Sequence, residues 1–209
     1  YPIPGNHDYH SAGANGYFGF FGPRAGQSGK GWYSFDLGRW HLVALNSNCD
    51  EVGGCEPGSE QERWLRADLA AHPARCTLAF WHHPRFSSGI THGSDPVVGG
   101  LWLALYQGGA EVVLVGHEHN YERFSPLDPV GIVDQARGVR EFVVGTGGRS
   151  HGRRSRRAGG RALRRDRARH ALAQCSGRYM VVGALTNGLP QLAQPVDLFA
   201  QRAVPAQPL

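Results

Sequence analysis

The chain has 209 residues, of which 41% are hydrophobic and 19% charged, a composition typical of a globular protein of one or two domains. No run of eighteen apolar residues is present, which argues against a membrane-spanning helix, and the opening residues lack the charged and apolar regions of a signal peptide. The chain does not begin with Met, so we expect a mature protein or an incomplete piece of one.

The formal net charge of +5 comes almost entirely from one stretch near the C-terminus. Residues 149–178 contain eleven Arg and one acidic residue, Asp166, whereas the rest of the chain carries a net charge of −5. An Arg-rich segment can bind a polyanion or nucleic acid, which is an alternative function for residues 149–178. The segment has no interleaved aromatic residues for base stacking, which argues against nucleic acid as a partner.

Apolar runs rich in branched and aromatic residues predict buried strands, and a hairpin turning at Leu37-Gly38 is expected to precede them. The predicted strands are residues 40–45, 77–81, 112–115 and 141–144. A capping box of Ser59 and Glu62 predicts a helix from about 60 to 72, and a second helix is expected at 99–107. Strands alternating with helices predict an α/β layered domain with functional loops at the strand ends.

The cysteines indicate the cellular compartment in which the protein is expected. Cys49 and Cys55 flank a short loop that contains Gly53-Gly54, so the two residues can approach closely enough for a disulfide. The alternative is two unpaired loop thiols. A disulfide would indicate an oxidising compartment, and we therefore expect a secreted protein. Cys76 opens an apolar run and is expected to be a buried small residue.

Three loops carry histidines, and each opens the chain or follows an apolar stretch. They are GNHD at residues 5–8, HHP at 82–84 and GHEHNYER at 116–123. His117 and His119 are two residues apart, so in extended backbone their side chains point to the same side. Several imidazoles at the ends of neighbouring strands favour a metal site, although residue type alone does not select the metal.

These three motifs, in this order and spacing, resemble those of the calcineurin-like metallophosphoesterases, and Tyr-Glu-Arg after the histidine pair is most similar to their purple acid phosphatase branch. The resemblance covers about residues 1–150. It implies a four-layer αββα sandwich, incomplete here at its N-terminus, with residues 1–148 as the C-terminal portion of the catalytic domain. It also implies two transition metals, iron with zinc, manganese or a second iron, and hydrolysis of phosphate mono- or diesters.

Individual roles also follow from the resemblance. Asn6, His82 and His117 would bind one metal, and His119 would bind the other. His7 would lie just outside the metals and contact the phosphoryl group, and His92 would help bind phosphate or protonate the leaving oxygen. Two metals close together can activate a water and neutralise charge on the reacting oxygens. Other interpretations stay open: Asn6 as a turn residue, His83 as an outer or packing residue, and Arg123 as an ion-pair partner or a phosphate contact.

The chain departs from the family pattern in two places. The family also has ligands upstream of GNHD, namely an acid on a first strand, a bridging Asp on a second and, in the purple branch, a Tyr shortly after it. None of them can be placed here, so we expect little activity from this chain alone. Residues 149–209 form an atypical Arg-rich tail. A reading-frame shift near residue 152 is a hypothesis for it, since reading the codons of Tyr179-Met180-Val181 one base later yields a Trp that the family favours in this region.

Overall fold

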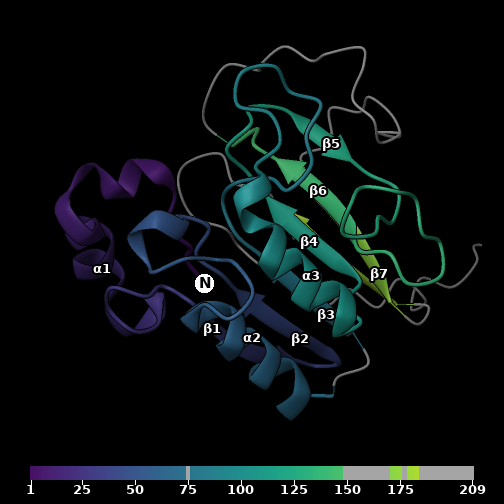
Figure 1. Cartoon of the computed structure of the whole chain (residues 1–209), viewed down its shortest axis with the longest axis horizontal. Coiled ribbons are helices and arrows are strands. Elements are labelled where there is room, and N and C mark those ends of the chain that lie inside the picture. The colour runs from purple at the N-terminus through teal and green to yellow at the C-terminus, as the bar shows by residue number, and fades with distance from the viewer. Residues whose placement is uncertain (74–75, 148–169, 176–177, 184–209) are drawn as a thin grey trace, which may run out of the picture.

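The computed structural model describes residues 1–73 and 76–147, and the backbone of two further strands at 170–175 and 178–183. Six strands form one mixed sheet in the order β1-β2-β3-β4-β6-β5 (Figure 1). The neighbouring strands β2, β3, β4 and β6 are parallel, and β1 and β5 are antiparallel at the two edges. The bounds are β1 Tyr33–Leu37, β2 Trp40–Ala44, β3 Cys76–Phe80, β4 Val112–Val115, β5 Tyr121–Arg123 and β6 Arg140–Val144.

The four strands predicted from apolar runs are confirmed as β2, β3, β4 and β6. Their residues are buried almost throughout, as expected for parallel strands covered on both faces. The predicted hairpin is present, but its turn lies at Gly38-Arg39, one residue later than expected. Leu37 stays in β1 because it pairs with Trp40, and Gly38 adopts the left-handed backbone that the tight turn requires.

Helices α2 (Glu60–Ala71) and α3 (Gly99–Gln107) lie side by side across one face of the sheet (Figure 1). Both were predicted, and the Ser59 hydroxyl caps α2 by accepting a hydrogen bond from the Glu62 backbone N–H. The largest apolar core fills the space between these helices and the sheet. It includes Leu65 of α2, Leu101 and Trp102 of α3, and Val43 and Val113 of the sheet.

A shorter helix, α1 (Asn15–Phe21), lies apart from the sheet and was not predicted. Its two glycines weaken helix propensity, and it is stabilised by burying Tyr17 and Phe18 against Ala14 and Ala25. Five short 3-10 segments are also present among the described residues. They are η1 Asn6–His10, η2 Ala12–Ala14, η3 Gly22–Ala25, η4 Cys49–Glu51 and η5 Pro96–Val98.

The opposite face of the sheet buries a second apolar cluster, centred on Trp40, Leu42, Leu78 and Phe142. A two-stranded antiparallel sheet, β7 (His170–Cys175) and β8 (Arg178–Gly183), is separate from the six-stranded sheet. The predicted domain boundary at 149, most of the Arg-rich segment and the proposed frame shift lie outside the described residues. Among the residues described, no helix has the length and apolar character to cross a membrane.

Candidate metal centre

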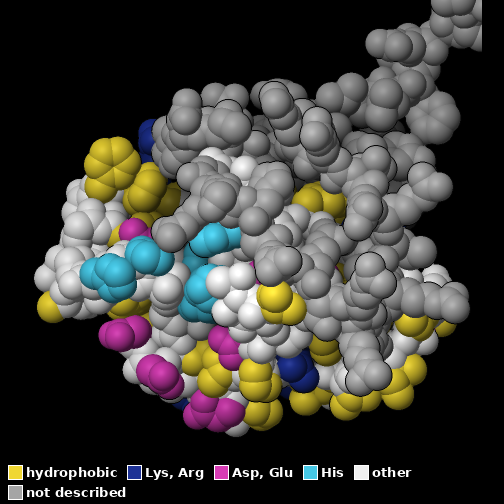
Figure 2. All heavy atoms as spheres, turned by 90° about the horizontal axis from the view of Figure 1, so that it is seen from above, with side chains coloured by type: hydrophobic (Ala, Val, Ile, Leu, Met, Phe, Trp, Pro, Cys, Tyr) yellow, Lys and Arg dark blue, Asp and Glu magenta, His cyan; other side chains and the backbone are white. Residues whose placement is uncertain are grey.

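The candidate site is built at the carboxyl end of the parallel strands. His82 and His83 follow β3, His117 follows β4, and a polar segment at 46–48 follows β2. Parallel strands end at the same edge of a sheet, and loops outside that edge are where α/β proteins bind ligands. Histidine side chains gather on one face of the molecule (Figure 2). The three histidine-bearing loops predicted from the sequence therefore meet at one place.

Three of the predicted ligands converge on one point. The Nε2 atom of His82 lies 2.9 Å from the amide Oδ1 of Asn6 and 3.0 Å from Nδ1 of His117. These residues are up to 111 positions apart in the chain. The side-chain oxygen of Asn6 contacts His82, so Asn6 does more than form a turn, which was the alternative interpretation.

His83 is closer to this point than the sequence indicated. Its ring centroid lies 4.5 Å from that of His117, and one ligand atom each of His82, His83 and His117 lie within 4.8 Å of one another. His83 Nδ1 also lies 2.8 Å from the Ser47 hydroxyl oxygen, which orients the ring. The pair His82-His83 indicated a histidine near the site, but a sequence pattern cannot tell which of two neighbouring side chains faces it.

His92 and His119 lie beside the convergent group. The ring centroid of His92 is 4.1 Å from that of His117 and 5.6 Å from that of His119. His92 is exposed and His119 is partly buried. His92 therefore lies next to both histidines of the GHEH motif, although 25 residues separate it from the first of them in the chain.

His7 lies farther out than the other predicted residues. It is exposed, and its ring contacts His10 with a centroid separation of 4.7 Å. Its link to the cluster is electrostatic, since a positive charge on His7 is one of the factors that lower the pKa of His82. Arg123, whose role was left open, is exposed and its guanidinium lies over the Phe142 ring at 5.8 Å from the centroid.

Burial keeps the central imidazoles uncharged. Desolvation, with the nearby histidines His83, His117, His7 and His92 adding repulsion, lowers the pKa of His82 to about 3. Desolvation and neighbouring histidines lower the pKa of His117 to about 4, and desolvation also lowers the pKa of His83. A neutral imidazole has a free nitrogen lone pair, so these side chains are ready to bind a metal near neutral pH.

Two backbone features shape the centre. Gly5 packs so closely on His82 that a Cβ on it would lie 3.0 Å from the imidazole Cε1, so a larger residue there would require the ring to shift. His117 has φ of +59°, in the left-handed region that non-glycine residues rarely adopt. Unfavourable backbone of this kind persists where surrounding contacts hold it, often at functional sites. Both residues stand in the motifs on which the site prediction rests.

Three buried carboxylates support the loop that carries His83 and His92, and sequence reasoning missed them. Glu118 accepts hydrogen bonds from the backbone N–H groups of His92 and Gly93, at 2.7 and 3.0 Å. Glu122 accepts bonds from the hydroxyl of Ser87 and the backbone N–H of Ser88. Glu141 accepts the N–H groups of Arg85 and Phe86 at 2.8 and 2.9 Å.

The segment after β2 supports the other side of the centre. The Ser47 hydroxyl oxygen accepts hydrogen bonds from the backbone N–H groups of His82 and His83, at 3.2 and 3.0 Å. The Asn48 amide donates to the backbone carbonyl of Pro4 at 3.2 Å, which ties the N-terminal motif to this segment. The hydrogen bonds fix the direction in which each motif enters the site.

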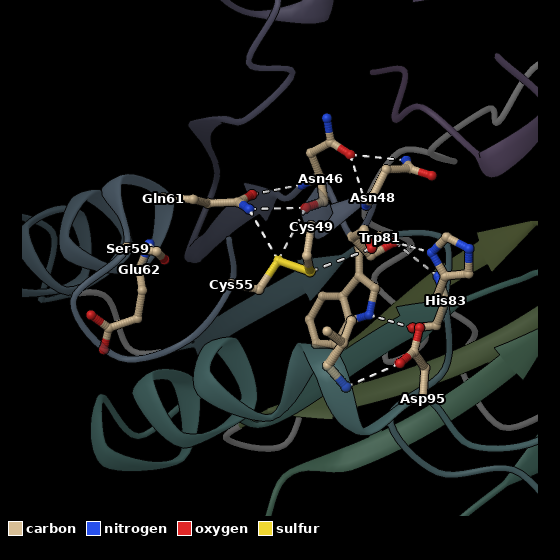
Figure 3. The surroundings of a disulfide bond; sticks show 12 residues. Asn46, Asn48, Cys49, Cys55, Ser59, Gln61, Glu62, Trp81, His83 and Asp95 are labelled. Atoms are coloured by element: carbon tan, nitrogen blue, oxygen red, sulfur yellow. Dashed lines mark hydrogen bonds between the residues drawn. A yellow bond between two sulfur atoms is a disulfide. The ribbon is translucent and has the colours of Figure 1, made fainter. Parts of the chain in front are cut away.

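The predicted disulfide Cys49–Cys55 is present immediately after this segment (Figure 3), with Cα atoms 5.3 Å apart. Cys55 Sγ lies 3.7 Å from the backbone carbonyl oxygen of Asn46 and from the Gln61 amide nitrogen, so the disulfide adjoins both the segment and α2. Cys76 is buried as expected, but it is also disulfide-bonded and so does not serve only as a small apolar residue.

The side chains present fit a transition metal. One amide oxygen and two or three neutral imidazole nitrogens form a donor set that suits zinc, iron or manganese. The outer hydrogen bonds to Ser47 and the carboxylates orient these donors, as in established metal sites. Asn6, His82 and His117, with His83 adjacent, could therefore hold one metal ion, while His119 stands a short distance away beside His92.

Residues 1–121 match the family of calcineurin-like phosphoesterases, and the chain belongs to that family. It is distantly similar to purple acid phosphatases over part of their chains. The chain is 31% identical to purple acid phosphatase 15 of Arabidopsis thaliana over 163 residues, covering 70% of this chain and 29% of that protein. An uncharacterized protein of Mycobacterium tuberculosis is 32% identical over 148 residues, covering 57% and 28% of the two chains.

A solved structure agrees with this assignment at the level of the fold. The purple acid phosphatase PPD1 from yellow lupin (Lupinus luteus) seeds superposes with a TM-score of 0.57 at 18% identity, over 76% of this chain and 28% of that one. The α/β fold with its mixed six-stranded sheet thus matches part of the purple acid phosphatase structure. The chain spans less than a third of the length of the curated relatives it matches.

Proposed function

We propose that this chain is part of the catalytic domain of a metal-dependent phosphoesterase of the purple acid phosphatase type, acting on phosphate mono- or diesters. The observation that carries the proposal is the convergence of three side chains on one point. His82 Nε2 lies within 3.0 Å of both Asn6 Oδ1 and His117 Nδ1. Membership of the phosphoesterase family supports it. The four-layer αββα arrangement belongs to the same proposal, with the apolar face at Trp40 and Phe142 as the surface between its two sheets.

In this proposal each predicted residue has a role. Asn6, His82 and His117 hold one metal ion, and His119 contributes to the other. The neighbouring His83 is oriented by Ser47 and completes the imidazole group around the first metal, either as a ligand or as an outer contact. The metals are iron with zinc, manganese or a second iron, and when bound they supply positive charge to the phosphoryl oxygens and an activated water.

His92 and His7 act on the substrate side. His92 lies against both His117 and His119, so its ring can reach an oxygen held between them and can pass a proton to the leaving group. His7 is exposed at the rim and can donate a hydrogen bond to an incoming phosphoryl group. The disulfide Cys49–Cys55 supports a secreted protein, because such bonds persist in oxidising compartments.

The test compares two proteins in a turnover assay with a chromogenic phosphate monoester and added iron, zinc or manganese. One is this chain, and the other is a chain extended upstream by its own coding sequence. Asn6 and neutral His carry no negative charge, so two cations held by them alone would repel each other. We therefore expect turnover of about 1 to 1,000 per second only in the extended chain, and its loss on His119→Ala.

Two outcomes would contradict the proposal in different ways. An extended chain that binds metal but hydrolyses neither monoesters nor diesters would disprove the proposed activity. Turnover by the unextended chain that is lost on His119→Ala would keep the activity but disprove the need for an upstream bridging carboxylate. A half-exposed histidine remote from the convergent group serves as the matched control, and His72→Ala should leave turnover unchanged.

A further inference from the structure

We propose that His41, Asp68 and His72 form a separate zinc site, remote from the candidate metal centre. The site lies where the start of β2 meets the C-terminal end of α2. His41 pairs in the sheet with Thr77, which precedes His82 by five residues. At about 3.3 Å per residue, this places the two sites roughly 16 Å apart along the strands, at opposite ends of the sheet.

The three side chains already point at one another. His41 Nε2 lies 2.8 Å from Asp68 Oδ2. His72 Nδ1 lies 3.3 Å from Asp68 Oδ1 and donates a hydrogen bond to the Asp68 backbone carbonyl oxygen at 2.9 Å. One ligand atom from each residue lies within 4.8 Å of the other two. His41 is 1% exposed and Asp68 7%, whereas His72 is 44% exposed and leaves the group open to an ion from solvent.

A second set of residues holds these ligands in place. Asp36 stands directly opposite His41 in the β1–β2 pair, and its Oδ1 accepts a hydrogen bond from His41 Nδ1 at 2.7 Å. The Ser34 hydroxyl donates to Asp68 Oδ1 at 2.7 Å. Metal-binding histidines usually donate their other ring N–H to a carboxylate in this way, which leaves the remaining nitrogen for the ion. The arrangement therefore has outer contacts as well as ligands.

The donor set is compatible with zinc. Two imidazole nitrogens and one carboxylate oxygen are the ligands of open tetrahedral zinc sites, in which a water fills the fourth position. His72 is stacked on His41 with ring centroids 4.6 Å apart, and turning its exposed side chain would direct a nitrogen to the same ion. Zinc would replace the proton that now lies between His41 Nε2 and Asp68 Oδ2, and that proton would pass to the buffer.

The competing interpretation is a proton in place of the metal. An imidazolium His41 could donate to Asp36 and Asp68 at once, since both ring nitrogens then carry hydrogen. The two interpretations differ in their dependence on His72. A proton between His41 and Asp68 needs nothing from His72, whereas a zinc ion with two remaining ligands would be bound weakly.

The test is a zinc titration of the full 209-residue chain carrying His117→Ala, with a competing chromogenic chelator. This background removes a central ligand of the candidate metal centre, so we expect one equivalent of zinc to remain. Adding His72→Ala should weaken its binding at least tenfold, and adding Asp36→Asn should weaken it by about 10- to 100-fold. His10→Ala is the matched control and should change nothing.

Cobalt provides a second measurement, because Co²⁺ in a tetrahedral site absorbs visible light. The His117→Ala chain should show this absorption, and the additional His72→Ala substitution should remove it while circular dichroism stays unchanged. A third measurement avoids the His117→Ala background and so does not depend on whether that variant folds. In the otherwise unaltered chain, His72→Ala alone should lower the number of zinc ions bound by one. Zinc binding that is absent in a folded His117→Ala chain, or indifferent to His72→Ala, would overturn the proposal.

Discussion

The carboxylate of Glu118 accepts the backbone N–H of His92 at 2.7 Å and that of Gly93 at 3.0 Å through one oxygen, Oε2. Glu118 is fully buried, and its other oxygen has no hydrogen-bond partner among the described residues. The histidine proposed to face the substrate is thus positioned by the residue between the two histidines of GHEH. Packing is tight, since a Cβ on Gly89 would lie 2.0 Å from Glu118 Cδ.

Glu118→Ala should release the loop that carries His92. Two backbone N–H groups lose their acceptor, and we expect a loss of about 2–4 kcal/mol in the free energy of unfolding. Glu118→Gln should cost far less, because one amide oxygen can accept both bonds. Urea unfolding gives the free energies, and hydrogen exchange at the His92 and Gly93 amides locates the effect. Equal amide protection in both variants would contradict the role of this carboxylate.

Gly5→Ala should weaken metal binding at the candidate centre without removing a ligand. The added methyl group would meet the His82 ring at 3.0 Å and displace it from Asn6 and His117. The matched control is Gly19→Ala in α1, where nothing lies within 4 Å and alanine favours the helix. Metal titration of both variants in a His72→Ala background checks this, and equal affinities would show that the close approach at Gly5 does not matter.

Acidification should destabilise the fold between about pH 6.5 and pH 3. The folded-state pKa is lowered to about 3 for His82 and about 4 for His117, so the unfolded chain binds more protons in this window. Stability is therefore fully present above pH 6.5 and falls as the pH is lowered, by on the order of 1–2 kcal/mol per histidine by pH 5. Urea unfolding from pH 7 to 5 measures it, and His82→Gln should flatten the dependence.

Removing the disulfide should have a modest effect. Cys49 and Cys55 close a short loop, and loop entropy limits its contribution to about 2–3 kcal/mol. We expect the Cys49→Ala/Cys55→Ala chain to unfold at lower urea concentration but to keep its α/β structure. Mass spectrometry of a non-reduced digest checks the bond itself. If both thiols were free in protein made in an oxidising medium, the proposed compartment would lose its support.

The fold was predictable where one physical signal dominated. The apolar runs of β2, β3, β4 and β6 were long enough to identify, and the Ser59 cap placed the start of α2. The three-residue strand β5 is too short to recognise from a pattern. α1 depends on burial of Tyr17 and Phe18, which overrides the poor helix propensity of its glycines.

The sequence motifs predicted which residues form the site, but they did not predict the hydrogen bonds that support it. Asn6, His82 and His117 were named from the order of their motifs, and the structure brings them together. Glu141 could not be found in this way. It lies inside an apolar strand, burial raises the pKa of its carboxyl to about 8, and its partners are backbone N–H groups of Arg85 and Phe86. Backbone N–H groups are present at almost every residue, so these partners cannot be identified from the sequence.

At position 117, which has left-handed backbone, stability favours glycine whereas the proposed metal binding requires histidine. Glycine adopts this conformation freely, whereas a side chain there costs about 1 kcal/mol. Selection for heat resistance alone would therefore tend to enrich His117→Gly and discard a proposed ligand. Directed evolution of this chain would need a metal-dependent readout in every round, or the variants that survive longest would be the ones that had lost their metal centre.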